Sequence, residues 1–126
     1  ARLRIHERLL TEKEQRAKTD FEVSLNGDDA GVDLISRSVA KDHSHQEYRS
    51  RIIGNARCTG HSECDAIITG EGRVSAAPEL TANHDDASLI HEAAIGKIAG
   101  EQLIKLMTLG LTEHEAEEQI ISGFLK

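Results

Sequence analysis

The sequence predicts a mainly β chain that ends in two helices, on the basis of three observations. From about residue 19 to residue 90, short segments of alternating apolar and polar residues, such as FEVSL at 21–25, are separated by Gly, Asn and Asp. This pattern is typical of strands joined by turns. Only 2% of the 126 residues are aromatic, so the core must be aliphatic. From about residue 97 onward, apolar residues recur at helical spacing instead.

The β segments, about four to six residues each, fit a sandwich, a barrel or a β-solenoid. A solenoid suits a chain with few aromatic rings, because stacked coils bury ladders of aliphatic side chains. No strict repeat motif is visible, so a solenoid would be irregular. The charged residues 1–18 leave two alternatives open. Leu3 and Ile5 alternate with charged residues as in a strand, whereas Leu3, Leu9 and Leu10 could line one side of a helix.

The last thirty residues predict a helical hairpin. Gly110 is a natural end for the first helix. Thr112 and Glu115 form the pattern of a capping box at the start of the second helix. We therefore expect a β body over residues 1–95 and a helical hairpin over residues 96–126, packed as one unit. The apolar residues assigned to the two helices are Ile98, Leu103, Leu106 and Met107, and then Ala116, Ile120, Ile121 and Phe124.

Composition excludes several classes of protein. The formal net charge of -7 gives no general attraction to phosphate backbones, so no nucleic-acid partner is expected. No apolar run approaches the roughly 18 residues of a membrane span, so no membrane partner is expected either. Charges begin at Arg2, which does not suit a secretory signal. The two cysteines are too few for a disulfide scaffold, and together these features predict a cytoplasmic protein with reduced thiols.

Cys58, His61 and Cys64 bring soft ligands together in one segment. Thiolate and imidazole suit zinc, copper(I) and iron–sulfur chemistry. In a strand, Cys58 and Cys64 would share a face, while His61 would point to the other face. The alternative is that each cysteine is a small buried core residue.

Two further histidine motifs are candidates. His43 and His45 lie on one face of an extended chain, which is how a cupin-like mononuclear metal site begins, but the remaining ligand spacing of that pattern is missing. His91 and Glu92 lie where the β body meets the helices. As vicinal residues of an extended chain they would face opposite ways and would not chelate one ion well.

Three ordered segments resemble the C-terminal core of the SufB/SufD family, the scaffold components of Suf iron–sulfur cluster assembly. These are GHSECDAIITGEGRVSAAPEL, HEAAIGKIAGEQL and GLTEHEAEEQIISGF. The likeness runs from about residue 31 to residue 124 and is strongest from residue 60. It implies a right-handed parallel β-helix followed by the helical hairpin. Members of this family are commonly much longer than this chain.

The resemblance also implies function. It predicts a scaffold, not an enzyme, that holds an iron–sulfur cluster transiently. Cys64, His91 and Glu92 occupy the positions implicated in holding the nascent cluster. The implied partners are an ABC-type ATPase, docked on the C-terminal helices, and a second SufB/SufD-type chain or a second copy, paired through the β-helix. One chain has too few ligands for a stable four-cysteine site, and an interface between two chains could complete a shared one.

Overall fold

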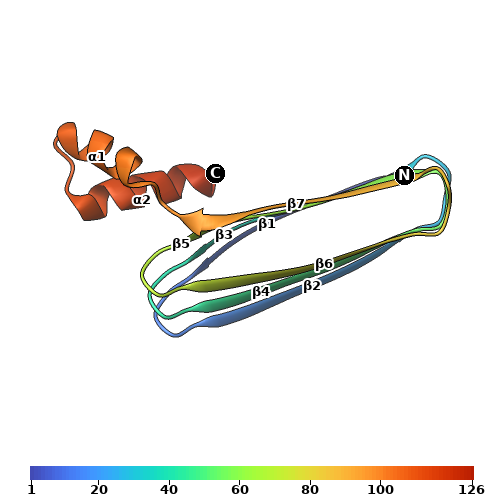
Figure 1. Ribbon diagram of the computed structural model, residues 1–126, viewed down its shortest axis with the longest axis horizontal. Coiled ribbons are helices and arrows are strands. Elements are labelled where there is room, and N and C mark those ends of the chain that lie inside the picture. Colours follow the sequence, from blue (N-terminus) through green and yellow to red (C-terminus); the bar gives the residue numbers. More distant parts are fainter.

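The computed structural model describes all 126 residues and is a flattened parallel β-solenoid of about three turns followed by two helices (Figure 1). The long strands of each turn run along opposite sides of the solenoid and are joined by tight turns at its two ends. The elements are β1 (Arg2–Thr11), β2 (Arg16–Leu25), β3 (Ala30–Ala40), β4 (His45–Gly54), β5 (Cys58–Ile68), β6 (Arg73–Ala82), β7 (Ala87–Lys97), α1 (Gly100–Thr108) and α2 (Glu113–Phe124).

The strands form two sheets in which all neighbours are parallel. One sheet has the order β1-β3-β5-β7 and the other has the order β2-β4-β6. Arg2 pairs with Gly31, Ala30 with Cys58, and Cys58 with Ala87. Each coil therefore lies on the preceding one with an offset of 29 or 28 residues. This regular offset distinguishes the solenoid from the sandwich and barrel that the sequence left open.

The strands are longer than the sequence predicts, at 10 or 11 residues instead of about four to six. The predicted turns at residues 26–29, 70–72 and 83–86 are confirmed, the break expected at residues 54–55 begins at Asn55, and residues 2–11 form a strand, not a helix. The predicted length was wrong because several of the inward positions are polar. Ser36, Ser50 and Ser62 are fully buried, so their strands do not show a continuous apolar alternation.

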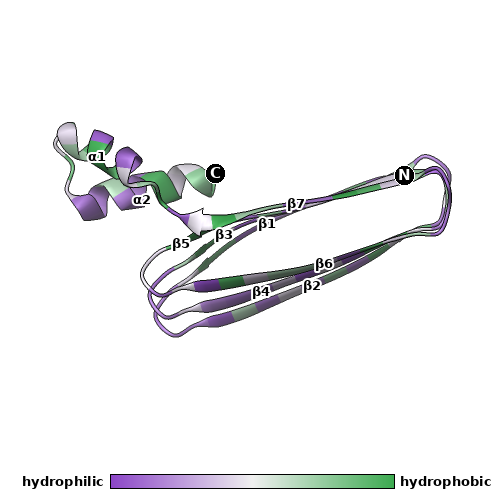
Figure 2. Ribbon diagram, viewed as in Figure 1, coloured by the Kyte–Doolittle hydropathy of each residue, from purple (hydrophilic) through white to green (hydrophobic).

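The interior is apolar near the turns that precede β3 and β5. Leu25, Val32, Leu34, Ile52 and Cys58 form the buried cluster there. Hydrophobic and hydrophilic stretches alternate along the strands because successive side chains face in and out (Figure 2).

Toward the opposite end, hydrogen-bonded polar groups replace the apolar cluster. Thr11 donates to Ser44 at 2.9 Å, and the amide of Gln46 donates to Thr11 at 2.9 Å. These bonds satisfy groups that would be costly to bury alone.

The helical hairpin forms as the sequence predicts. Thr112 accepts from the backbone of Glu115 and Glu115 accepts from the backbone of Thr112, both at 3.1 Å, which completes the capping box. Gly110, at φ +99°, follows the end of α1 in the left-handed conformation that favours glycine. Lys41 Nζ binds Glu118 at 2.6 Å and so ties α2 to the β body. Neither helix is long and apolar enough to span a membrane.

Candidate functional site

The alternation of β5 places both cysteines inside the solenoid. Cys58 and Cys64 are 3% and 1% exposed, whereas His61 between them lies on the outer face. The predicted division of these three residues between two faces is therefore confirmed. Cys58 belongs to the apolar cluster, which agrees with a packing role. Cys64 lies among polar neighbours instead, in register with Ser36 on β3.

His91 lies on the neighbouring strand β7. It is in register with Ser62, two residues before Cys64, so the two candidate ligands are diagonal neighbours on the inner face of one sheet. The His91 side chain points inward because it lies two and four residues after Leu89 and Ala87, which pack against the core from the same face of β7. His91 Nδ1 is buried and has no hydrogen-bond partner. A buried polar atom without a partner calls for an explanation, and a bound ion or ligand is one of those that fit an imidazole nitrogen.

Glu92 lies on the other face of the same strand. Its Oε2 is 3.6 Å from His61 Nε2, and His61 Nδ1 is 3.6 Å from Asp33 Oδ1. Vicinal His91 and Glu92 therefore diverge as expected. The structure places Cys64 and His91 on the inner face of one sheet and Glu92 on its outer face. No group of three or more His, Cys, Asp or Glu side chains is arranged to hold a metal ion within this single chain.

Burial decides the protonation of the two inner residues. Burial raises the pKa of the Cys64 thiol to about 11, and the nearby charges of Asp65 and Glu7 act in the same direction. Burial also lowers the pKa of His91, to which His61 adds, while Glu92 opposes the shift. At neutral pH the thiol is protonated and the imidazole is neutral. A metal must therefore displace the thiol proton, whereas the imidazole is ready to bind.

Sequence reasoning missed the polar groups around Cys64. Glu7 accepts from Ser36 at 2.9 Å and from Thr19 at 2.8 Å, and Glu7, Ser36 and Cys64 occupy one row across β1, β3 and β5. The sequence signal that could have found them is the length of each coil, because Ser36 follows Glu7 by 29 residues and Cys64 follows Ser36 by 28.

Three asparagines in successive turns repeat that spacing. Asn55 donates to Asn26 at 2.7 Å, and Asn83 donates to Asn55 at 2.8 Å. These three residues mark the length of each coil in the sequence, although the strands between them differ.

The second histidine motif does not gather further metal ligands. His43 lies in the turn before β4 and pairs with Glu71 at 2.6 Å, whereas His45 begins β4 and faces outward. The charged residues around them are mostly basic, because four cations outnumber the two carboxylates, and this excess repels a metal cation. The cations are Arg16, Lys18, Arg73 and Lys97, and the carboxylates are Glu47 and Glu71. These surroundings disfavour the cupin-like alternative.

The parallel solenoid followed by a helical hairpin places the chain among the β-helical proteins. The family model described as "SUF system FeS cluster assembly, SufBD core domain" matches residues 1–124. The chain belongs to the SufBD family of iron–sulfur cluster assembly proteins.

Relatives named as iron–sulfur cluster assembly SufBD family proteins support this assignment. The one from Methanocaldococcus jannaschii is 39% identical over 90% of this chain and 36% of its own length. One from Pyrococcus horikoshii is 37% identical over 94% of this chain and 27% of its own length. The chain thus spans about a third of the length of the relatives it matches.

The raised pKa of Cys64 predicts its reactivity toward iodoacetamide. With a pKa of about 11, only about one thiol in a thousand is ionised at pH 8. In a chain carrying Cys58→Ser, we expect the alkylation rate of Cys64 to rise about tenfold per pH unit up to about pH 10, measured by intact-mass spectrometry. The urea-unfolded chain is the control, and its rate should level off near pH 9. Levelling at the same pH in the native chain would contradict the buried-thiol account.

Proposed function

We propose that this chain is part of a scaffold, not an enzyme, that holds an iron–sulfur cluster as cargo while the cluster is assembled and passed on. Cys64 and His91 are the proposed ligands. The observation that carries the proposal is the buried, unpartnered Nδ1 of His91 beside an inward cysteine on the neighbouring strand. The relatives are longer than this chain, so the function of a longer protein that contains it belongs to the same proposal.

The donor set suits a cargo better than a resident cofactor. Thiolate sulfur and neutral imidazole nitrogen both bind iron in iron–sulfur proteins, and histidine in place of cysteine alters the properties of a cluster. Cys64 must lose its proton to bind, because burial keeps the thiol neutral. That proton competes with the metal, so binding weakens as pH falls and release is favoured.

A second chain would complete the ligand set. β7 and β6 are the last strands of their sheets, at the edge opposite β1 and β2, and no strand of this chain covers them on that side. Exposed apolar side chains on these edge strands include Leu80, Ile90 and Ile95. An exposed edge of this kind can pair with a strand of another chain. We propose that a second SufBD-type chain, or a second copy, pairs here and adds ligands beside Cys64 and His91.

Glu92 has a separate place in this proposal. It lies on edge strand β7 but on the outer face, with His61 as its neighbour. A carboxylate is a harder donor than a thiolate and suits incoming iron before sulfide is added. We assign Glu92 to the outer rim of the paired edge, not to the inner pair.

The hairpin is the proposed docking surface for the ABC-type ATPase. α1 has no buried residue, and Ile104, Met107 and Leu109 are exposed. Exposed apolar groups on one short element are typical of a protein interface. The hydrogen bond and ion pair between Lys41 and Glu118 would transmit a movement of α2 to the turn after β3.

Cluster uptake tests the ligand assignment. The chain is reconstituted anaerobically with iron and sulfide, and the visible absorption of the cluster is measured. Cys64→Ser should lower cluster occupancy at least about tenfold, since second-shell changes alone weaken metal sites by about that much. Cys58→Ser is the matched control, because Cys58 faces the same interior but packs in the apolar cluster. Equal loss in both variants, or no uptake by the unmodified chain, would contradict the assignment.

Capture of the Suf ABC-type ATPase tests the docking surface. The doubly substituted chain Ile104→Glu, Leu109→Glu should lose capture, because charges in an apolar interface must be desolvated. Leu10→Glu is the control, since Leu10 is similarly exposed but lies on β1. Unchanged capture by the double variant would place the ATPase elsewhere.

A further inference from the structure

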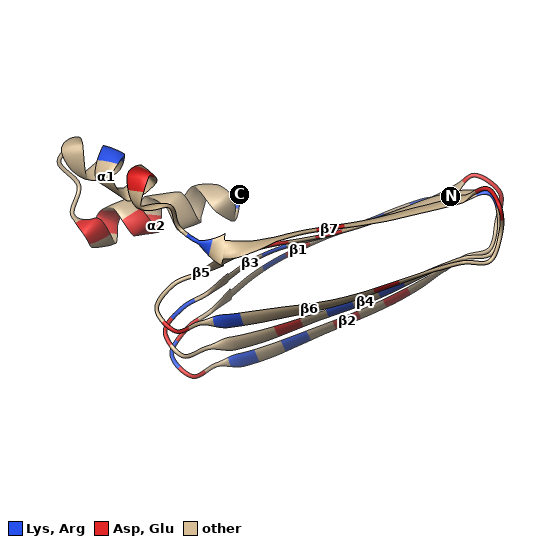
Figure 3. Cartoon of the chain, viewed as in Figure 1, with Lys and Arg blue, Asp and Glu red and all other residues tan.

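A hollow away from Cys64 and His91 lies at the end of the solenoid where β2, β4 and β6 begin and β7 ends. It has a volume of about 630 Å³ and no hydrophobic lining residue. Three permanently charged cations line it, Arg16 from β2, Arg73 from β6 and Lys97 from β7. Blue positions at the starts of β2 and β6 and at the end of β7 mark this gathering in Figure 3.

These cations have no carboxylate partner. Neither Arg16, Arg73 nor Lys97 lies within 4.0 Å of an acidic group, although the chain has 22 acidic residues against 15 basic ones. The one acidic lining residue, Glu71, is held by His43 at 2.6 Å. Composition therefore does not explain the excess of positive charge.

The strand register concentrates the charge further. Arg16, His45 and Arg73 occupy one row across β2, β4 and β6. Arg16 and Arg73 therefore lie on either side of His45, and no acidic residue stands in the row. The row thus has an electrostatic reason to bind an anion.

The backbone beneath the row is tightly packed. The amide of His45 donates to Gln15 at 3.0 Å, and the amide of Arg73 donates to Ser44 at 3.0 Å. A Cβ atom at Gly72 would collide with the carbonyl oxygen of Ala40, so the chain has no spare room there. The cationic side chains therefore extend from a fixed base, which reduces the ordering cost of binding.

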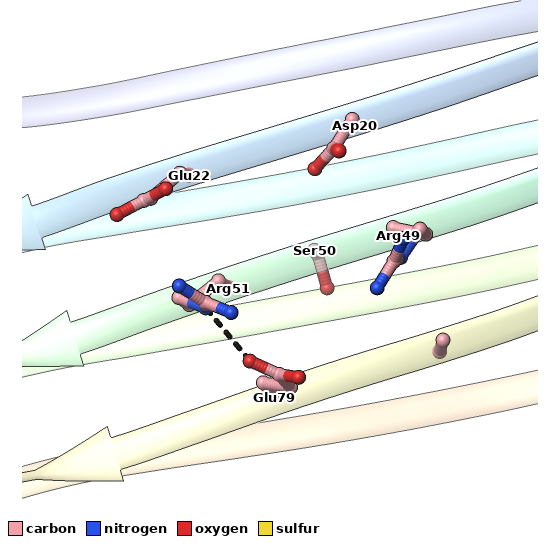
Figure 4. Close-up of a pocket in the computed structure, with 7 residues that line it drawn as sticks. Asp20, Glu22, Arg49, Ser50, Arg51 and Glu79 are labelled. Carbon is pink, nitrogen blue, oxygen red and sulfur yellow. Dashed lines mark hydrogen bonds and ion pairs between the residues drawn. The ribbon is translucent and has the colours of Figure 1, made fainter.

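A neighbouring hollow on the same sheet lacks this property. Arg49 and Arg51 line it, but so do Asp20, Glu22 and Glu79, and Arg51 binds Glu79 at 2.7 Å (Figure 4). Its three carboxylates outnumber its two guanidinium groups. The arginines on this face thus lie among carboxylates in one hollow and among other cations in the other.

We propose that the hollow of Arg16, Arg73 and Lys97 binds a short polyphosphate, either free or as the phosphate chain of a nucleotide. Arg16 and Arg73 begin strands that are two strand spacings apart, about 9.6 Å. Both guanidinium groups can reach a single phosphate, but three cations lining a hollow of about 630 Å³ match the several negative charges of linked phosphates better than the charge of one phosphate group. Arginine forks match phosphate oxygens, and Lys97 adds a third positive charge.

Isothermal titration calorimetry with tripolyphosphate, orthophosphate and ATP tests the proposal at a fixed salt concentration. Tripolyphosphate should bind at least about tenfold more tightly than orthophosphate, and each of Arg16→Gln and Arg73→Gln should weaken it by about tenfold. ATP tighter than tripolyphosphate would identify a nucleotide, and the reverse order would identify a free polyphosphate.

Arg51→Gln is the matched control and should leave binding unchanged. Absence of saturable tripolyphosphate binding, equal weakening by Arg51→Gln, or equal affinity for orthophosphate would each overturn the proposal. Circular dichroism confirms that each variant is folded. Because neither cysteine takes part, the result is independent of cluster uptake.

Discussion

The parallel register of the coils is the constraint on which the rest of the structure depends. Because each strand pairs with the one 28 or 29 residues away, every inward position lies beside another inward position of the neighbouring coil. A slip by one residue would turn a whole strand inside out. The register therefore decides that Cys64 and His91 share the interior, that Glu92 faces outward and that Arg16 and Arg73 form one row.

The same constraint explains the polar interior. Flat coils bring two sheets face to face along their whole length, and this aromatic-poor chain fills only part of that space with aliphatic side chains. Ser50 and Tyr48 bond to Ser62, at 3.0 Å and 3.2 Å, and Glu7 receives two hydroxyl donors. Against this satisfied background, His91 Nδ1 is the one buried side-chain nitrogen or oxygen without a partner.

Much of the fold was predictable from local signals. Asn, Gly and Asp marked the turns, and the capping box of Thr112 and Glu115 marked the start of α2, because each depends on a few neighbouring residues. The solenoid could not be separated from other β folds by alternation alone, since alternation is common to all of them.

The candidate site was predictable only in part. The alternation of side chains along a strand correctly placed Cys64 and His61 on opposite faces, and likewise His91 and Glu92. This prediction needs no knowledge of the neighbouring strands. The diagonal placement of His91 and Cys64 and the row of Glu7, Ser36 and Cys64 depend on pairing across 28 or 29 residues. The cation row arises in the same way. Long-range register, not residue type, was the missing information.

The central claim is that two chains complete one cluster site at the edge formed by β6 and β7. Native mass spectrometry of the anaerobically reconstituted chain tests it most directly, because it weighs the cluster and the protein in the same ion. The account predicts that ions carrying a cluster have the mass of two chains plus one cluster, and that monomers occur only among the ions without a cluster. A cluster carried predominantly by single chains would contradict it.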